Sequence, residues 1–220
     1  SPHPPSFYVD LYRRDNLYGG HVIMLGPGNE AAAMEALAAW PGGMQLGGGI
    51  TAANAAHWLE RGASHVIVTS WIFHDGQVDL DRLEELALLV GKNRLVLDLS
   101  CRWRDNGYYV VTDRWQRFTS LRLGAESLAS LAAYCDEFLV HAVDVEGTCT
   151  GLDERLLRLL ADHTPLPTTY AGGIATMADM ELVQKVGAGR IDATVGSALD
   201  IFGGRGIAYR ELVTFHGQQP

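Results

Sequence analysis

The feature that most constrains the fold of this 220-residue chain is a sequence device that occurs twice. Each copy is a short apolar strand, a glycine-rich turn, an amphipathic helix, a second strand and a second small-residue turn. The copies occupy residues 44–73 and 167–204, and 124 positions separate Gly48 of the first from Gly172 of the second. Repetition at a long, nearly constant period indicates that the chain is built from two similar halves.

The turns of both copies are candidates for anion binding. Where a turn opens a helix, unpaired backbone N–H groups converge at the positive end of the helix dipole, so an anion can bind without Lys or Arg. One isolated Gly-Gly pair more often only permits a tight turn, but two copies favour a phosphate site in each half. The candidate ligands form a first cradle of Gly48, Gly49, Thr69 and Ser70 and a second cradle of Gly172, Gly173, Gly196 and Ser197.

The rest of the chain alternates strand-like and helix-like segments. Strands are expected near 21–25, 44–46, 65–70, 94–99, 138–143 and 168–171, with a seventh before Gly196, and a hairpin arm near 108–112. Helices are expected over 7–17, 30–40, 52–61, 79–90, 125–134 and 153–163 and after each turn of the second cradle. This alternation predicts an α/β fold with a parallel sheet covered by helices, either doubly wound or closed as a barrel. The internal repeat favours a (βα)8 TIM barrel of two half-barrels, in one domain over residues 1–220.

The two halves differ in their number of strands. The half that begins at Arg94 contains four strand-like runs, whereas the preceding half contains three. The period places the counterpart of Asp98 about 26 positions before Ser1, in a barrel of roughly 250 residues. We therefore expect the first βα unit to be absent from this sequence, and we expect the proline-rich residues 1–6 to be irregular.

Composition limits the partners of the chain. A net charge of −9 without a basic stripe argues against nucleic acid, and no apolar run approaches the roughly 18 residues of a membrane span. The three cysteines, Cys101, Cys135 and Cys149, are widely spaced, which suits a reducing compartment and shows no metal-ligand pattern. The sequence predicts a soluble intracellular protein without a metal.

Eight stretches of the chain together resemble one family, the isomerase of histidine biosynthesis in its plant and fungal form. They are GGHVIMLG (19–26), LGGGI (46–50), ASHVIVTSW (63–71), RLVLDLSCR (94–102), VTDRWQ (111–116), HAVDVEG (141–147), YAGG (170–173) and VGSALDIFGG (195–204). The resemblance implies a (βα)8 barrel without a cofactor, a monomer, and a location in the cytoplasm or the plastid stroma. It also implies an Amadori rearrangement of an aminoaldose to an aminoketose, on a small substrate that carries a phosphate at each end.

Asp98 is the candidate catalytic residue, since barrel enzymes place such groups at the ends of strands. From position alone it could equally cap a turn or pair with Arg102. The rearrangement needs an acid to protonate the ribose ring oxygen and a base to remove a proton from the adjacent carbon. The resemblance implies that Asp98 is the acid, and that the base is an aspartate on the first strand, which this sequence lacks.

The resemblance further implies substrate contacts from two loops. Trp115 would stack on the imidazole, a contact worth roughly 1–3 kcal/mol, although a lone tryptophan is more often buried. His141 is interpreted as a core histidine, and Asp200 as a brace for the last helix. The substrate residues implied for the loops are Arg102, Trp115, Glu146 and Thr148.

Two alternatives to the isomerase remain open. One is a related phosphosugar barrel enzyme, such as the cyclase of the same pathway, which shares the repeat and the two phosphate sites. The other is a non-catalytic phosphosugar-binding barrel, which is the better description if the first strand is truly missing.

Overall fold

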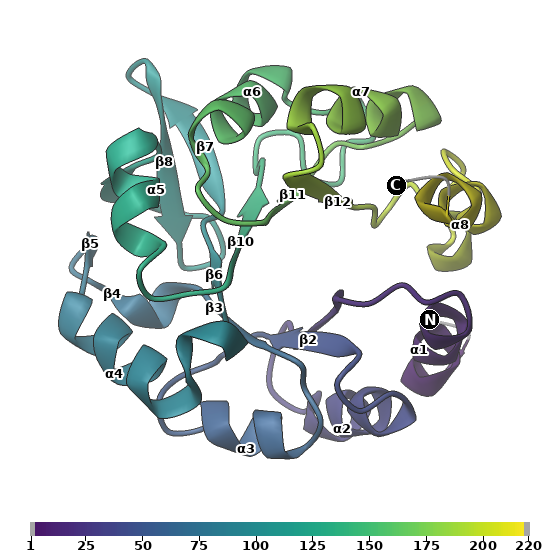
Figure 1. Ribbon diagram of the computed structural model, residues 1–220, viewed down its shortest axis with the longest axis horizontal. Helices are drawn as coiled ribbons and strands as arrows, with labels where there is room; N and C mark the ends of the chain where they lie inside the picture. The colour runs from purple at the N-terminus through teal and green to yellow at the C-terminus, as the bar shows by residue number, and fades with distance from the viewer. Residues whose placement is uncertain (1–2, 218–220) are drawn as a thin grey trace. The chain divides into compact units, whose positions relative to one another are not determined.

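The computed structural model describes residues 3–217, in which strands and helices alternate along the chain (Figure 1). The described residues divide into two compact units: unit 1 is 3–98 with 133–136, and unit 2 is 99–132 with 137–217. The main sheet has seven strands in the order β1-β2-β3-β6-β10-β11-β12. The α/β class and the seven strands predicted from the sequence are confirmed.

Unit 1 holds the first four strands of this order. They are β1 (Gly20–Ile23), β2 (Met44–Gly47), β3 (Val66–Val68) and β6 (Leu95–Asp98), and neighbouring strands pair in parallel. The helices are α1 (Pro5–Arg14), α2 (Glu30–Ala39), α3 (Ala55–Glu60) and α4 (Leu80–Val90). Leu46, Val66 and Leu97 are fully buried. Strands covered on both faces need continuous apolar runs, which is why the sequence identified them.

Unit 2 holds the last three strands, β10 (Glu137–His141), β11 (Thr168–Ala171) and β12 (Ile191–Thr194), with parallel pairing of β11 to both neighbours. Its helices are α5 (Ala125–Leu131), α6 (Glu154–His163), α7 (Met177–Gly187) and α8 (Tyr209–Gly217). The hairpin arm predicted near 108–112 is confirmed. It is the centre of a three-stranded antiparallel sheet made of β7 (Cys101–Arg104), β8 (Gly107–Thr112) and β9 (Arg117–Arg122).

Two local predictions were wrong, and one short hairpin was not predicted. Helix α1 begins at Pro5, within the stretch expected to be irregular, because proline in the first turn of a helix loses no hydrogen bond. Residues 73–78 form a short hairpin of β4 (Phe73–His74) and β5 (Gln77–Val78), which has no counterpart among the predicted strands. The turn at Gly196 opens no α-helix, since only the short 3-10 helix η3 (Asp200–Phe202) lies between it and α8.

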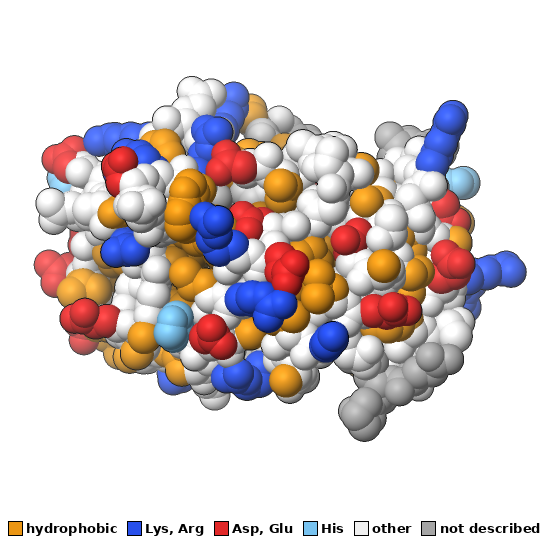
Figure 2. All heavy atoms as spheres, turned by 90° about the horizontal axis from the view of Figure 1, so that it is seen from above, with side chains coloured by type: hydrophobic (Ala, Val, Ile, Leu, Met, Phe, Trp, Pro, Cys, Tyr) orange, Lys and Arg blue, Asp and Glu red, His pale blue; other side chains and the backbone are white. Residues whose placement is uncertain are grey.

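The surface carries both signs of charge. On the face drawn in Figure 2, Lys and Arg side chains lie among Asp and Glu, with hydrophobic side chains between them. No helix in residues 3–217 is both long enough and apolar enough to span a bilayer.

Candidate active site

The second cradle surrounds a small cavity in unit 2. The cavity has a volume of about 40 Å³ and lies at the carboxyl ends of β10, β11 and β12. Five of the predicted substrate and phosphate ligands line it: Glu146, Gly172, Gly173, Gly196 and Ser197. His141 and Thr194 also line it; His141 is half-buried, and its Nδ1 lies 3.3 Å from Ser100 Oγ. Like Asp98, His141 lies at the end of a strand, the position where barrel enzymes place functional groups.

The Gly-Gly turn of this cradle can be made only by glycine. Gly172 and Gly173 have φ angles of +118° and +74°, a region that other residues rarely adopt. A Cβ atom on Gly173 would overlap the carbonyl oxygen of Gly151 and lie 2.9 Å from Cγ2 of Val145. The backbone N–H of Gly151 donates to the carbonyl of Gly173 (3.1 Å), so the turn and the loop after β10 are packed directly together.

The N–H groups of the two residues just before α7 are bonded within the cap of that helix. The carboxylate of Asp179 accepts hydrogen bonds from the N–H groups of Ala175 (2.9 Å) and Thr176 (2.8 Å), in a capping box. These two donors are already occupied by the Asp179 carboxylate, so they are not available to an anion. An anion bound here would use the turn itself.

Two loop residues implied as substrate contacts have defined partners. Arg102 Nε donates to Asp144 Oδ1 (2.8 Å), and the N–H of Trp103 donates to the other carboxylate oxygen of Asp144 (3.2 Å). Trp115 is 38% exposed, and its ring centre lies 6.0 Å from that of His141. The alternative that Trp115 is buried beneath its loop is therefore wrong.

The loop that carries Trp115 has an unusual backbone. Asp113, Arg114 and Trp115 have φ angles of +52°, +57° and +65°. Consecutive left-handed residues other than glycine are rare and are typically found where function fixes the backbone. This conformation supports the assignment of the loop to the candidate site.

Thr148 lies in the loop after β10 but does not line the cavity. Its hydroxyl donates to the carbonyl of Val145 (2.7 Å) and lies 2.7 Å from the hydroxyl of Thr150. The neighbouring Cys149 is exposed, and its sulfur lies 3.5 Å from the Ser197 hydroxyl. The loop thus contacts the second cradle through Cys149 and Gly151, while Thr148 bonds to the loop itself.

The first cradle lies in unit 1, at the carboxyl ends of β2 and β3. Gly48 has a φ of +97°, and a Cβ atom there would overlap the carbonyl oxygen of Met24; Gly49 has a φ of +70° and open space around it. Thr69 precedes the 3-10 helix η1 (Ser70–Ile72). Asp98 is the last residue of β6 and is partly buried. Both cradles therefore combine a left-handed Gly-Gly turn with a small hydroxyl residue.

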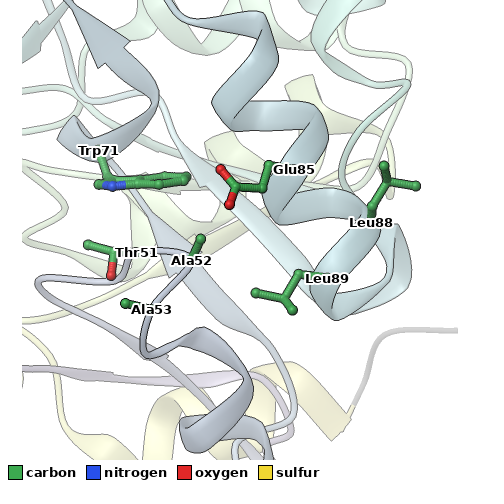
Figure 3. Close-up of a pocket in the computed structure, with 7 residues that line it drawn as sticks. All are labelled: Thr51, Ala52, Ala53, Trp71, Glu85, Leu88 and Leu89. Carbon is green, nitrogen blue, oxygen red and sulfur yellow. The ribbon is translucent and has the colours of Figure 1, made fainter.

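A wider groove in unit 1 is shown in Figure 3. It has a volume of about 790 Å³ and is lined by Thr51, Ala52, Ala53, Trp71, Glu85, Leu88 and Leu89. None of these residues belongs to the first cradle. Its surface is mainly apolar, and its one charged side chain is a carboxylate, so it is poorly suited to a phosphate.

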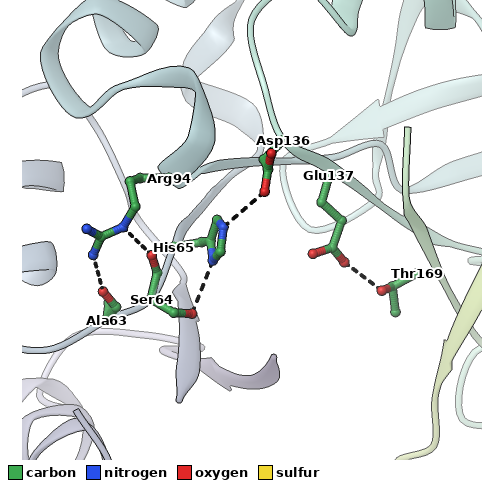
Figure 4. Close-up of polar contacts among 7 residues, drawn as sticks. All are labelled: Ala63, Ser64, His65, Arg94, Asp136, Glu137 and Thr169. Atoms are coloured by element: carbon green, nitrogen blue, oxygen red, sulfur yellow. Dashed lines mark hydrogen bonds and ion pairs between the residues drawn. The ribbon is translucent and has the colours of Figure 1, made fainter. Parts of the chain in front are cut away.

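Polar contacts at the amino ends of strands are shown in Figure 4. His65 lies between Ser64 Oγ (3.2 Å) and Asp136 Oδ2 (3.3 Å), and Arg94 donates to the carbonyls of Ala63 and Ser64. In unit 2, Thr169 donates to Glu137 (2.6 Å). These residues precede or begin strands, whereas the cradles follow them, so we interpret these contacts as structural.

Several known proteins are similar in sequence to this chain over nearly its whole length. The family described as histidine biosynthesis protein matches residues 21–204. A chloroplastic protein of Medicago truncatula, 1-(5-phosphoribosyl)-5-((5-phosphoribosylamino)methylideneamino)imidazole-4-carboxamide isomerase, is 55% identical over 214 residues, which cover 96% of this chain and 68% of the relative. The chain belongs to this isomerase family. Isomerases of the same name from Neurospora crassa and Saccharomyces cerevisiae are 48% and 44% identical, covering 100% of this chain and 86% of each relative. The predicted resemblance to the isomerase family is confirmed.

Proposed function

We propose that the protein catalyses the aldose-to-ketose isomerisation for which these relatives are named, a step of histidine biosynthesis. The observation that carries the proposal is identity of 44–55% to isomerases over at least 96% of the chain. The substrate is then a small molecule with two phosphoribosyl groups. The name of the Medicago relative, which is chloroplastic, supports a location in the plastid.

We further propose that the fold is a (βα)8 barrel of two half-barrels that acts as a monomer. The parallel pairing of the sheet and the family match support the barrel. Each unit would supply one phosphate-binding site, the first cradle in unit 1 and the second cradle in unit 2. Backbone N–H groups at left-handed glycine turns form concave anion sites, which offset the net negative charge of the chain locally.

Asp98 is the proposed general acid. Protonation of the ribose ring oxygen breaks its bond to C1 and leaves a protonated imine, because the attached nitrogen donates its electron pair to C1. Loss of the proton on C2 then gives a neutral enaminol, which becomes the ketose when C1 gains a proton and the hydroxyl on C2 loses one. The oxidation of C2 is balanced by the reduction of C1 in the same molecule, so an acid and a base suffice. Trp115 would stack on the imidazole, while Arg102, Glu146 and Thr148 would contact the substrate from their loops.

The test is turnover of the bis-phosphorylated aminoaldose to its ketose. General acid catalysis contributes roughly 100-fold to 10,000-fold, so Asp98→Asn should lower kcat by about that factor. The matched control is Asp81→Asn, which removes an exposed carboxylate on α4 and should leave kcat unchanged. Wild-type kcat in Asp98→Asn would contradict the role of Asp98. Binding of inorganic phosphate by the parent protein without any turnover would favour the non-catalytic alternative.

A further inference from the structure

Asp153 lies where three segments of unit 2 meet. Its side-chain Oδ2 accepts a hydrogen bond from the hydroxyl of Tyr108 (2.6 Å), and its own N–H donates to the hydroxyl of Tyr170 (2.8 Å). Its other carboxylate oxygen accepts from the N–H of Leu156 (3.1 Å) and caps α6. Tyr108 and Tyr170 are almost completely buried, at 3% and 0% exposure. These bonds are therefore shielded from competition by water.

Each of these segments continues into part of the candidate site. Tyr108 belongs to β8, which leads into the left-handed loop that carries Trp115. Tyr170 belongs to β11, which leads into Gly172 and Gly173. Asp153 itself ends the loop after β10, which carries Glu146. One carboxylate and its N–H thus connect the three segments, although Asp153 does not line the cavity.

Helix capping alone does not account for this arrangement. Asp79 caps α4 in unit 1 through the same bond, from the N–H of Arg82 (3.1 Å). That cap uses one carboxylate oxygen and the neighbouring Arg82 side chain on the same helix. At Asp153 the second oxygen and the backbone N–H are instead used by tyrosines from two different strands.

We propose that Asp153 is a positioning residue, which sets the placement of the Trp115 loop, the Glu146 loop and the Gly172-Gly173 turn relative to one another. The inference rests on the proposed function, since these segments are taken to hold the substrate. Small misplacements of groups that hold a substrate can lower activity by as much as roughly 100-fold. Removal of the Tyr108 bond should therefore affect substrate use more than stability.

The test compares four variants in the isomerase assay and in binding of inorganic phosphate. Tyr108→Phe removes only one hydroxyl, and Asp153→Ser keeps a capping oxygen but cannot reach Tyr108. Both should lower kcat/KM about tenfold or more and weaken phosphate binding. Asp153→Asn, which can cap α6 and bond to Tyr108, should restore most of this loss. Asp79→Ser makes the same cap change in unit 1 and should leave kcat/KM unchanged.

The outcomes separate this inference from the proposed function. Wild-type kcat/KM and phosphate affinity in both Tyr108→Phe and Asp153→Ser would overturn the positioning role while leaving the isomerase intact. If the parent protein does not turn over the aminoaldose, the proposed function fails, and phosphate affinity alone decides the role of Asp153. If Asp153→Ser does not fold, Tyr108→Phe decides it. A parent protein that neither turns over the substrate nor binds phosphate overturns both proposals.

Discussion

Alanine at Gly173 should destabilise the protein strongly, and the structure gives the size of the effect. The φ of +74° at this position costs a residue with a Cβ about 1–2 kcal/mol. The new methyl group would also overlap the carbonyl oxygen of Gly151 and press on Val145, and forcing extra atoms into a packed site costs about 1–3 kcal/mol. Together these effects predict a loss of about 2–5 kcal/mol in the free energy of unfolding.

Gly49→Ala is the matched control for this prediction. Gly49 has a similar φ of +70°, but nothing lies near the position of its missing Cβ. It should lose only the backbone contribution, about 1–2 kcal/mol. Urea unfolding of both variants gives the two losses, and in a protein of this size each kcal/mol lowers Tm by about 2–4 °C. If Gly173→Ala loses no more free energy than Gly49→Ala, the turn is not packed against the loop as described.

Two further predictions concern unit 1 and α7. Burial raises the pKa of Tyr12 from 10.0 to about 12, so the stability present below pH 10 should fall as pH rises toward 12, because the unfolded chain ionises first. Ultraviolet titration and pH-dependent unfolding of the parent and Tyr12→Phe test this. If the free energy of unfolding falls equally between pH 10 and pH 12 in both proteins, the prediction is contradicted. Thr176→Ala removes the side-chain acceptor for the N–H of Asp179 and should lower the free energy of unfolding by about 1 kcal/mol, measured in urea. An unchanged unfolding midpoint would show that Asp179 alone maintains the cap.

The fold was predictable from the sequence where local patterns decide structure. Buried parallel strands need apolar runs, and these runs located all seven strands of the main sheet. The interpretation of Asp200 as a brace is confirmed, since its carboxylate accepts from the N–H of Tyr209 at the start of α8 (2.8 Å). The start of α1 at Pro5 was missed because proline disrupts a helix interior but not its first turn.

The candidate site was predictable only in part. The residue types of the second cradle could be read from the repeat, and the structure gathers its glycines and Ser197 around one cavity. The contacts between segments that are distant in the sequence could not be predicted from it. Nothing near Arg102 in the sequence indicates its pairing with Asp144, and nothing near Gly173 indicates its contact with Gly151. The place of His141 in the cavity lining could not be predicted either, because a strand buried on both faces gives no periodic signal for which side chains face a cavity.

A structure from crystals of the protein grown with inorganic phosphate would test the two proposed phosphate-binding sites most directly. Bound phosphate should be seen at both turns, with one ion at Gly48, Gly49 and Ser70 and the other at Gly172, Gly173 and Ser197. Both ions should accept hydrogen bonds from backbone N–H groups of the turns. Phosphate at neither turn, or at only one of them at saturating concentration, would contradict the proposal that the two cradles each bind one phosphate group of the substrate.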